Sequence, residues 1–186
     1  MFIDSQKAFD TVGHTILVHK LSKFCIDGTT PSWISNYLRA RTQKVQVDGQ
    51  ISSPAKIDIG VPRGSILDPL LFLLYINNLG SILSNSKHHM YADDTVIFLE
   101  SDKPLNSQKL MTDVLVKLNK WVINNKLSIN LKNKYMIFGT QAMITKYKDF
   151  SLQIDNSEIE RVNYFTYLGL ALDEHLNWNQ NMTTTS

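Results

Sequence analysis

The spacing of apolar residues along the chain alternates between two periods, and each period predicts one kind of secondary structure. Apolar residues that recur every three or four positions indicate helices, and this pattern occupies residues 7–21, 32–38, 66–79 and 105–125. Alternating apolar runs bounded by turn residues indicate strands and hairpins, and these occupy residues 2–3, 43–59, 90–100, 134–139 and 151–161, with a last apolar run at 164–170. The mixture predicts an α+β fold, with helices on one face of an antiparallel sheet.

Length, composition and charge exclude several classes of protein. The chain has 186 residues, of which 43% are hydrophobic, enough for one domain with a core and too many for a disordered chain. With 19 basic and 17 acidic residues the net charge is +2, so any nucleic-acid contact must come from a local groove and not from a basic tail. The single cysteine, Cys25, excludes an intrachain disulfide and a multi-cysteine zinc site.

The sequence contains no segment typical of membrane insertion or secretion. The longest apolar run, residues 69–76, is far shorter than the roughly 18 residues of a transmembrane helix. Asp4 and Asp10 occupy the region where a signal peptide has a basic start and an apolar stretch. We therefore expect a nuclear or cytoplasmic protein that is not secreted. Because residues 1–4 resemble the middle of a buried strand, we also expect the chain to begin inside a domain.

Two adjacent carboxylates carry the strongest chemical signal. Asp93 and Asp94 lie where an apolar strand turns back into the apolar residues 96–99. Inside a strand, one of them would face the core, where an unpaired charge costs several kcal/mol. At the tip of a hairpin, both carboxylates can point toward one hard cation such as Mg²⁺. The alternative is an Asp-Asp turn that is simply exposed to solvent.

A third carboxylate, Asp4, strengthens the prediction of a metal site. It ends the apolar run 2–3 and leads into a predicted helix, and neighbouring strand ends in a sheet place such residues at one rim. Three carboxylates from two strands can hold two divalent ions, which activate an attacking hydroxyl and stabilise a leaving phosphate oxygen. Alternatively, Asp4 is an acidic residue favoured by the dipole of the following helix.

The segment 60–65, with the sequence GVPRGS, precedes an apolar helix and is a further candidate. Its glycines allow the backbone to approach a ligand closely, and the N-terminus of the helix favours an anion. The segment matches neither of the common glycine-rich phosphate motifs. A plain connection between a strand and a helix therefore remains the alternative.

These segments, taken in order, resemble motifs A to E of the reverse transcriptases of non-LTR, LINE-type retrotransposons, and jockey-like elements in particular. The resemblance lies in residues 2–12 for motif A, 60–78 for motif B, 91–94 for motif C, 125–138 for motif D and 167–169 for motif E. It covers nearly the whole chain. It implies a ferredoxin-like or RNA-recognition-like polymerase palm over residues 1–140, followed at 141–186 by the end of the palm, the start of the thumb and a frayed C-terminus.

The resemblance also implies roles for individual residues near the aspartates. Asp4, Asp93 and Asp94 would be the catalytic ligands of two Mg²⁺ ions. Phe9 would be the steric gate that clashes with a ribose 2′-hydroxyl, and Ala8 would lie beneath the incoming sugar. If the resemblance did not extend to Phe9, this residue would be an ordinary apolar side chain of the predicted helix.

Further residues are implied by motifs B and D. Arg63 and Gly64 would line the pocket for the nucleotide and the template. Lys132 or Lys134 would assist the departure of pyrophosphate, although the segment around them is one residue shorter than the family pattern. A solvated lysine is the alternative for each.

Several positions depart from the family pattern. Arg63 replaces a glutamine, Asp68 a glycine and Asn78 an aspartate, while Gly13 stands where an aspartate is expected and Asn181 where a histidine is. Such scattered changes are typical of a decayed or domesticated copy. All three aspartates proposed as metal ligands are nevertheless retained.

The function implied by the resemblance is that of an RNA-directed DNA polymerase. It would transfer a deoxynucleotidyl group to a primer 3′-hydroxyl by two-metal chemistry, with an RNA template, a DNA primer and dNTPs as partners and no membrane. The alternative is a catalytically inactive palm remnant that binds nucleic acid; a pure protein-interaction domain would leave three acidic strand ends unexplained. Only three residues precede Asp4, so we expect little activity from this chain alone and expect fingers and endonuclease regions in a full-length element.

Overall fold

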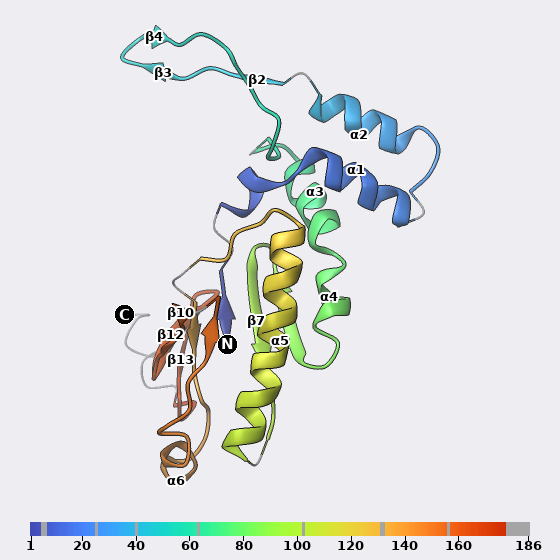
Figure 1. Cartoon of the computed structure of the whole chain (residues 1–186). Coiled ribbons are helices and arrows are strands. Elements are labelled where there is room, and N and C mark those ends of the chain that lie inside the picture. The colour runs from blue at the N-terminus through green and yellow to red at the C-terminus, as the bar shows by residue number, and fades with distance from the viewer. Residues whose placement is uncertain are drawn as a thin grey trace. The chain divides into compact units, whose positions relative to one another are not determined.

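The computed structural model describes residues 1–4, 7–24, 26–39, 41–62, 64–101, 103–130, 133–155 and 157–177 (Figure 1). The chain divides into two compact units, each of which is described by itself. The first comprises Met1–Asp4, Ile82–Lys120 and Ile129–Ser186, and the second comprises Ser5–Ser81 and Trp121–Ser128. Both contain helices and strands, so the prediction of a mixed α and β fold is confirmed. The predicted palm boundary near residue 140 stays a prediction.

A five-stranded sheet forms the centre of the first unit. Its strand order is β11-β8-β1-β7-β6, with bounds Glu160–Arg161, Lys134–Tyr135, Phe2–Ile3, Asp94–Phe98 and Lys87–Tyr91. Neighbouring strands are antiparallel except β11 and β8, which are parallel. The N-terminal strand β1 is thus inserted between strands from much later in the chain, and all of its residues are buried.

The β6–β7 hairpin forms where the sequence predicts a turn between two strands. Tyr91 pairs with Asp94, so only Ala92 and Asp93 form the connection, and Ala92 has a φ of 50°. Two-residue turns of this left-handed type match the twist of the flanking strands. The second strand therefore begins at Asp94, two residues before the apolar run 96–99.

Helix α5, Pro104–Asn124, confirms the longest predicted helix. Met111, Val114 and Leu118 are buried at a spacing of three or four residues, as expected for a helix with one apolar stripe. The remainder of the first unit contains the short helix α6, Gln141–Thr145, in which Thr140 accepts a hydrogen bond from the Met143 N–H at the N-cap. The sequence pattern did not indicate α6.

Two small hairpins complete the first unit. Strand β9, Gln153–Ile154, pairs with β10, Ser157–Glu158, which confirms the hairpin predicted within 151–161, although the end of that segment joins the main sheet as β11. Strand β12, Tyr164–Tyr167, pairs with β13, Leu170–Asp173. The ring of Phe2 stacks on Phe165 with centroids 4.1 Å apart, so the β12–β13 hairpin packs against the central strand.

The second unit begins with a helical segment that is interrupted. The 3-10 helix η1, Ala8–Thr11, is followed by α1, His14–Lys23. The prediction of one helix over 7–21 is therefore wrong at Val12 and Gly13, which are extended. Gly13 makes a bridge to Ile59, and the Gly60 N–H donates to the Val12 carbonyl at 2.8 Å. These backbone bonds replace the helical bonds at the interruption.

Three further helices and a hairpin belong to this unit. They are α2, Thr30–Leu38, which starts two residues before the predicted cap, α3, Leu67–Ile76, and the short α4, Leu79–Ile82. The predicted hairpin over 43–59 is confirmed in two pieces, in which β3, Gln46–Val47, pairs with β4, Gln50–Ile51, and β2, Thr42–Gln43, pairs with β5, Ala55–Lys56. In Figure 1 this hairpin extends as an arm of the second unit.

The core of the second unit lies between α1 and α3. Leu17, Leu21 and Phe72 are almost completely buried there. The hydroxyl of Tyr75 donates to the Asn125 carbonyl and accepts from the Gly13 N–H at 3.3 Å, so a buried tyrosine connects three segments of the unit. Within the described part of the chain, no helix has both the length and the apolar character to cross a membrane.

Candidate functional site

The three aspartates singled out from the sequence lie at one end of the five-stranded sheet. Strands β1 and β7 are antiparallel, with Phe2 opposite Val96 and Ile3 opposite Thr95. Continuing this register by one residue places Asp4 next to Asp94. Asp93 belongs to the turn directly before β7. Sheet pairing therefore brings together carboxylates that are about ninety residues apart along the chain.

The electrostatics of Asp94 reflect this grouping. Burial raises the pKa of the Asp94 carboxyl, and the neighbouring charges of Asp93 and Asp4 raise it further. Mutual repulsion of carboxylates is relieved when a divalent cation binds among them, and carboxylate oxygens are the hard donors that Mg²⁺ prefers. In this respect the residues present fit a magnesium ion.

The side chains are not already arranged as metal ligands. Among the described residues, no three histidine, cysteine, aspartate or glutamate side chains are grouped closely enough to hold a metal ion. Binding of one ion by all three aspartates therefore requires their side chains to move toward each other. Asp4 is the exposed member of the group, whereas Asp93 and Asp94 are half-buried.

Two asparagines contact Asp4, and the sequence analysis assigned no role to either. The backbone N–H of Asn130 donates to the Asp4 carbonyl at 2.9 Å, and its side-chain Nδ2 donates to Oδ2 of Asp4, also at 2.9 Å. The Asp4 N–H donates to Oδ1 of Asn133 at 3.1 Å. Both asparagines belong to the segment that resembles motif D, but nothing in its apolar pattern indicates what they contact.

Tyr167 reaches the same end of the sheet from the β12–β13 hairpin. Its ring lies 5.9 Å from that of Phe2, measured between centroids, and its hydroxyl is 3.3 Å from Nδ1 of His89. Burial raises the pKa of Tyr167, and the charge of Asp94 contributes to the shift. The segment that resembles motif E thus lies beside the aspartates in the first unit.

The residues predicted to contact the nucleotide belong to the second unit or lie outside the described residues. Ala8 and Phe9 are part of η1, where Ala8 is buried and the Phe9 ring packs against Phe72 with centroids 4.6 Å apart. They and Gly64 are not among the residues that the sheet brings together. Arg63 and Lys132 lie outside the described residues, as does the predicted frayed end from residue 178. The alternative to Lys132, Lys134, is ion-paired with Glu160 at 3.1 Å.

A steric restriction at Gly60 and a hydrogen bond from Gly64 constrain the loop before α3. Gly60 has a φ of 88°, and a Cβ there would lie 2.9 Å from the Asp10 carbonyl oxygen, so only glycine fits. The Gly64 N–H donates to Oδ2 of the buried Asp68 at 2.9 Å. Asp68, where the resemblance implies a glycine, therefore holds the Gly64 end of the loop in place.

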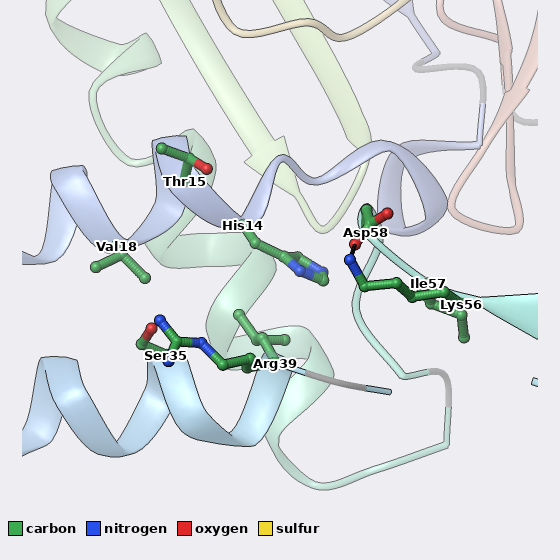
Figure 2. Close-up of a pocket in the computed structure, with 9 residues that line it drawn as sticks. His14, Thr15, Val18, Ser35, Arg39, Lys56, Ile57 and Asp58 are labelled. Carbon is green, nitrogen blue, oxygen red and sulfur yellow. Dashed lines mark ion pairs between the residues drawn. The ribbon is translucent and has the colours of Figure 1, made fainter. Parts of the chain in front are cut away.

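A cavity of about 410 Å³ lies within the second unit. It is lined by residues of α1 and α2 and by residues 56–58, among them His14, Arg39 and Lys56. Figure 2 shows the His14 ring facing the ion pair between Lys56 and Asp58, whose Nζ and Oδ1 atoms are 2.7 Å apart. Nε2 of His14 lies 2.7 Å from the Gly60 carbonyl. The cavity thus combines two basic side chains and a carboxylate with the apolar side chains of Val18, Leu38 and Ile57.

Comparison with known proteins identifies the family. Residues 1–172 match the family described as reverse transcriptase (RNA-dependent DNA polymerase). The RNA-directed DNA polymerases from mobile element jockey of Drosophila funebris and Drosophila melanogaster are 26% and 27% identical to the chain, in each case over 98% of the chain and 20% of the relative. The Retrovirus-related Pol polyprotein from type-1 retrotransposable element R2 of Popillia japonica is 28% identical over 90% of the chain and 25% of that protein.

The chain belongs to the reverse transcriptase family. The predicted resemblance to the non-LTR, LINE-type branch is confirmed by the jockey relatives. The chain spans about one fifth of the length of these relatives.

Proposed function

We propose that the chain supplies the palm of an RNA-directed DNA polymerase, in which Asp4, Asp93 and Asp94 hold two Mg²⁺ ions. The observation that carries the proposal is the register of β1 on β7, which places Asp4 beside the turn that contains Asp93. The raised pKa of Asp94 supports it, because concentrated negative charge is what a cation site requires. The palm would occupy residues 1–140, and 141–186 would end the palm and begin the thumb.

The chemistry proposed for this site is nucleotidyl transfer to a primer 3′-hydroxyl on an RNA template. Bound Mg²⁺ would supply charge neutralisation for the triphosphate and activation of the attacking hydroxyl. The aspartates would keep these charges fixed at the end of a rigid sheet, and such preorganisation accounts for most of the catalytic effect in phosphoryl transfer. Deoxynucleoside triphosphates and a template–primer duplex would be the partners.

The substrate contacts remain those implied by the resemblance. Phe9 would select deoxynucleotides, Ala8 would lie beneath the sugar, and Arg63, Gly64 and Lys132 would contact the nucleotide or its phosphates. The packing of Phe9 on Phe72 supports a gate with a fixed ring, because a side chain held between neighbours can exclude a hydroxyl. In a longer chain that includes this segment and extends primers, Phe9→Ala should increase ribonucleotide use relative to deoxynucleotides. Unchanged discrimination would argue against the gate.

Metal binding tests the site directly in the 186-residue chain. Titration with Mn²⁺, followed by electron paramagnetic resonance, should show binding that Asp93→Asn weakens at least tenfold, because the variant removes one charge from the group. Asp48→Asn is a matched control, since Asp48, like Asp93, lies in the two-residue turn of a hairpin, but it belongs to the second unit. Equal affinity in wild type and Asp93→Asn would refute the metal site.

Primer extension tests the reaction itself. A longer chain that carries these residues should extend a DNA primer on an RNA template in the presence of Mg²⁺, and Asp93→Asn should abolish the extension. Extension that survives in Asp93→Asn would show that the three aspartates are not the catalytic ligands.

A second candidate function is nucleic-acid binding by a palm that no longer catalyses. The cavity lined by Arg39 and by the Lys56–Asp58 ion pair favours it, because the exposed guanidinium of Arg39 suits a phosphate of a nucleic-acid backbone. Binding of an RNA–DNA duplex should then weaken with salt, weaken further in Arg39→Ala and remain unchanged in Asp93→Asn. Duplex binding without any Mg²⁺-dependent extension in the longer chain would favour this candidate.

A further inference from the structure

We propose that Asn130 and Asn133 form a clamp that holds Asp4 in place as a metal ligand, while the side chains of Asp93 and Asp94 move toward it to complete the site. Three hydrogen bonds carry the inference: two from Asn130 to the carbonyl and carboxylate of Asp4, and one from the Asp4 N–H to Asn133. All three lie within the first unit. The inference rests on the proposed function, because the clamp matters for activity only if Asp4 binds a metal ion.

The two asparagines hold the backbone of Asp4 at the point where strand β1 has ended. Strand β1 comprises only Phe2 and Ile3, so the backbone of Asp4 lies outside it. Asn130 and Asn133 nevertheless occupy both polar groups of the Asp4 backbone, one at the carbonyl and one at the N–H. The main chain at Asp4 is therefore held by side chain and backbone groups from the segment between α5 and β8.

The clamp also restricts the carboxylate. Asp4 is exposed, and an exposed aspartate side chain samples several rotamers unless a partner selects one. Nδ2 of Asn130 donates to Oδ2 of Asp4 at 2.9 Å, so the carboxylate can offer Oδ1 to a cation. Because the asparagine amide is uncharged, it orients the carboxylate without placing a positive charge near the cation. A lysine or arginine in the same place would neutralise the carboxylate and compete with the metal ion.

The buried side chain of Asn133 supports the clamp independently of Asn130. Its side chain is 4% exposed, and its Nδ2 has no hydrogen-bond partner among the described residues. An unsatisfied buried amide is destabilising, and most proteins avoid it. Here Oδ1 is engaged by the Asp4 N–H, so the contact with Asp4 keeps the amide in an orientation that leaves Nδ2 unpaired. The two asparagines are therefore positioning residues for Asp4.

The experiment compares Mn²⁺ affinity in variants of the 186-residue chain. Asn130→Ala removes the amide that orients Asp4 and should weaken Mn²⁺ binding about 10–100-fold, the usual effect of losing a hydrogen-bond partner of a metal ligand. Asn130→Gln keeps an amide donor and should recover part of the affinity. Asn124→Ala, at an exposed position at the end of α5, is the matched control and should bind as wild type does.

The readouts separate a positioning role from a structural one. Thermal unfolding of Asn130→Ala without metal should stay close to wild type, while its Mn²⁺ resonance spectrum changes along with the affinity. If Asp93→Asn weakens binding and neither Asn130 variant does, the clamp is wrong and the metal site stands. If Asp93→Asn binds as tightly as wild type, or wild type binds no Mn²⁺, the proposed metal site fails and the clamp with it. If Asn130→Ala unfolds, Asn130→Ser, whose side chain is too short to reach Oδ2 of Asp4, replaces it, and a wild-type spectrum and affinity in that variant refute the clamp.

Discussion

The Lys20 ammonium donates a hydrogen bond to Oδ1 of Asn78 at 2.9 Å, in a partly buried contact within the second unit. Lys20 is buried, and it also donates to the Tyr75 carbonyl and lies over the rings of Tyr75 and Trp121. Within the described residues no carboxylate is paired with it. Burial lowers the pKa of Lys20 to about 8. The resemblance to motif B implies an aspartate at the position of Asn78. In this chain the Lys20 ammonium is instead bound by an amide oxygen, a backbone carbonyl and two aromatic rings.

Restoring a carboxylate at this position should stabilise the chain. Asn78→Asp gives the Lys20 ammonium a counter-charge at hydrogen-bonding distance, and a hydrogen bond to a charged group contributes about 1–3 kcal/mol. We expect a higher free energy of unfolding at pH 7, measured by urea denaturation. Asn77→Asp is the control, because it adds the same charge at the end of α3, where the helix dipole disfavours an acid.

The pH dependence of this gain follows from the lowered pKa of Lys20. A lysine whose folded pKa lies below its unfolded value destabilises the fold while it is charged, and stability increases as the pH rises through the folded value toward 10.5. Wild type should therefore gain stability between about pH 8 and pH 10. The advantage of Asn78→Asp should shrink over the same interval, and a constant advantage would contradict the assigned contact.

Removal of the Tyr75 hydroxyl should destabilise the second unit. Tyr75→Phe leaves the buried Asn125 carbonyl and the Gly13 N–H without the partner they share. The loss of a buried hydrogen bond with both remaining groups unpaired costs about 1–3 kcal/mol. Urea denaturation of Tyr75→Phe should show this decrease, whereas Tyr164→Phe, at an exposed position, should leave the midpoint unchanged.

The loop before α3 should depend on Asp68. Asp68→Ala removes the acceptor of the Gly64 N–H and an acid from the first turn of α3, and the two losses together should cost about 1–2 kcal/mol. Asp68→Asn keeps an oxygen acceptor, so it should retain most of the stability. Equal destabilisation by both variants would mean that the contact with Gly64 contributes little.

The ionised carboxyl of Asp94 should lower the stability of the metal-free fold, although the proposed metal site requires it. Because burial and the charges of Asp93 and Asp4 raise the folded pKa of Asp94, its ionised form is disfavoured in the folded state. Stability should then decrease as the pH rises from the unfolded pKa of this carboxyl through its folded value. Asp94→Asn should raise the unfolding temperature at pH 7 without metal and remove the further rise that Mn²⁺ gives wild type. A lower unfolding temperature in Asp94→Asn would contradict this account.

Features determined by neighbouring residues were predictable from the sequence. Asp48-Gly49 indicated its hairpin because both residues adopt positive φ there, and the apolar stripe of α5 follows from residues three and four apart. The meeting of Asp4 with Asp93 and Asp94 at one end of the sheet was predicted from the position of each at the end of an apolar run, but the pairing of β1 with β7 that produces it was not.

Features that depend on distant partners were not predictable in the same way. The extended backbone at Val12 and Gly13 is fixed by bonds to Ile59 and Gly60, while the helical period alone continues through them. The contacts of Asn130 with Asp4 likewise leave no trace in a local pattern, since polar residues in a loop are compatible with solvent as well as with a partner. Local periodicity does not specify which distant group a polar side chain will meet.

The asparagine clamp has a consequence for the order in which the chain folds. Its two side-chain contacts join residues separated by 126 and 129 positions, so Asp4 leaves the ribosome long before its partners are synthesised. Helices such as α5 close contacts over a few residues and form fast, whereas contacts between distant segments form slowly because a long loop must be closed first. In refolding experiments, recovery of Mn²⁺ binding should therefore lag behind recovery of helical circular dichroism. A translation product that stops before residue 130 would carry all three aspartates and still lack an oriented Asp4.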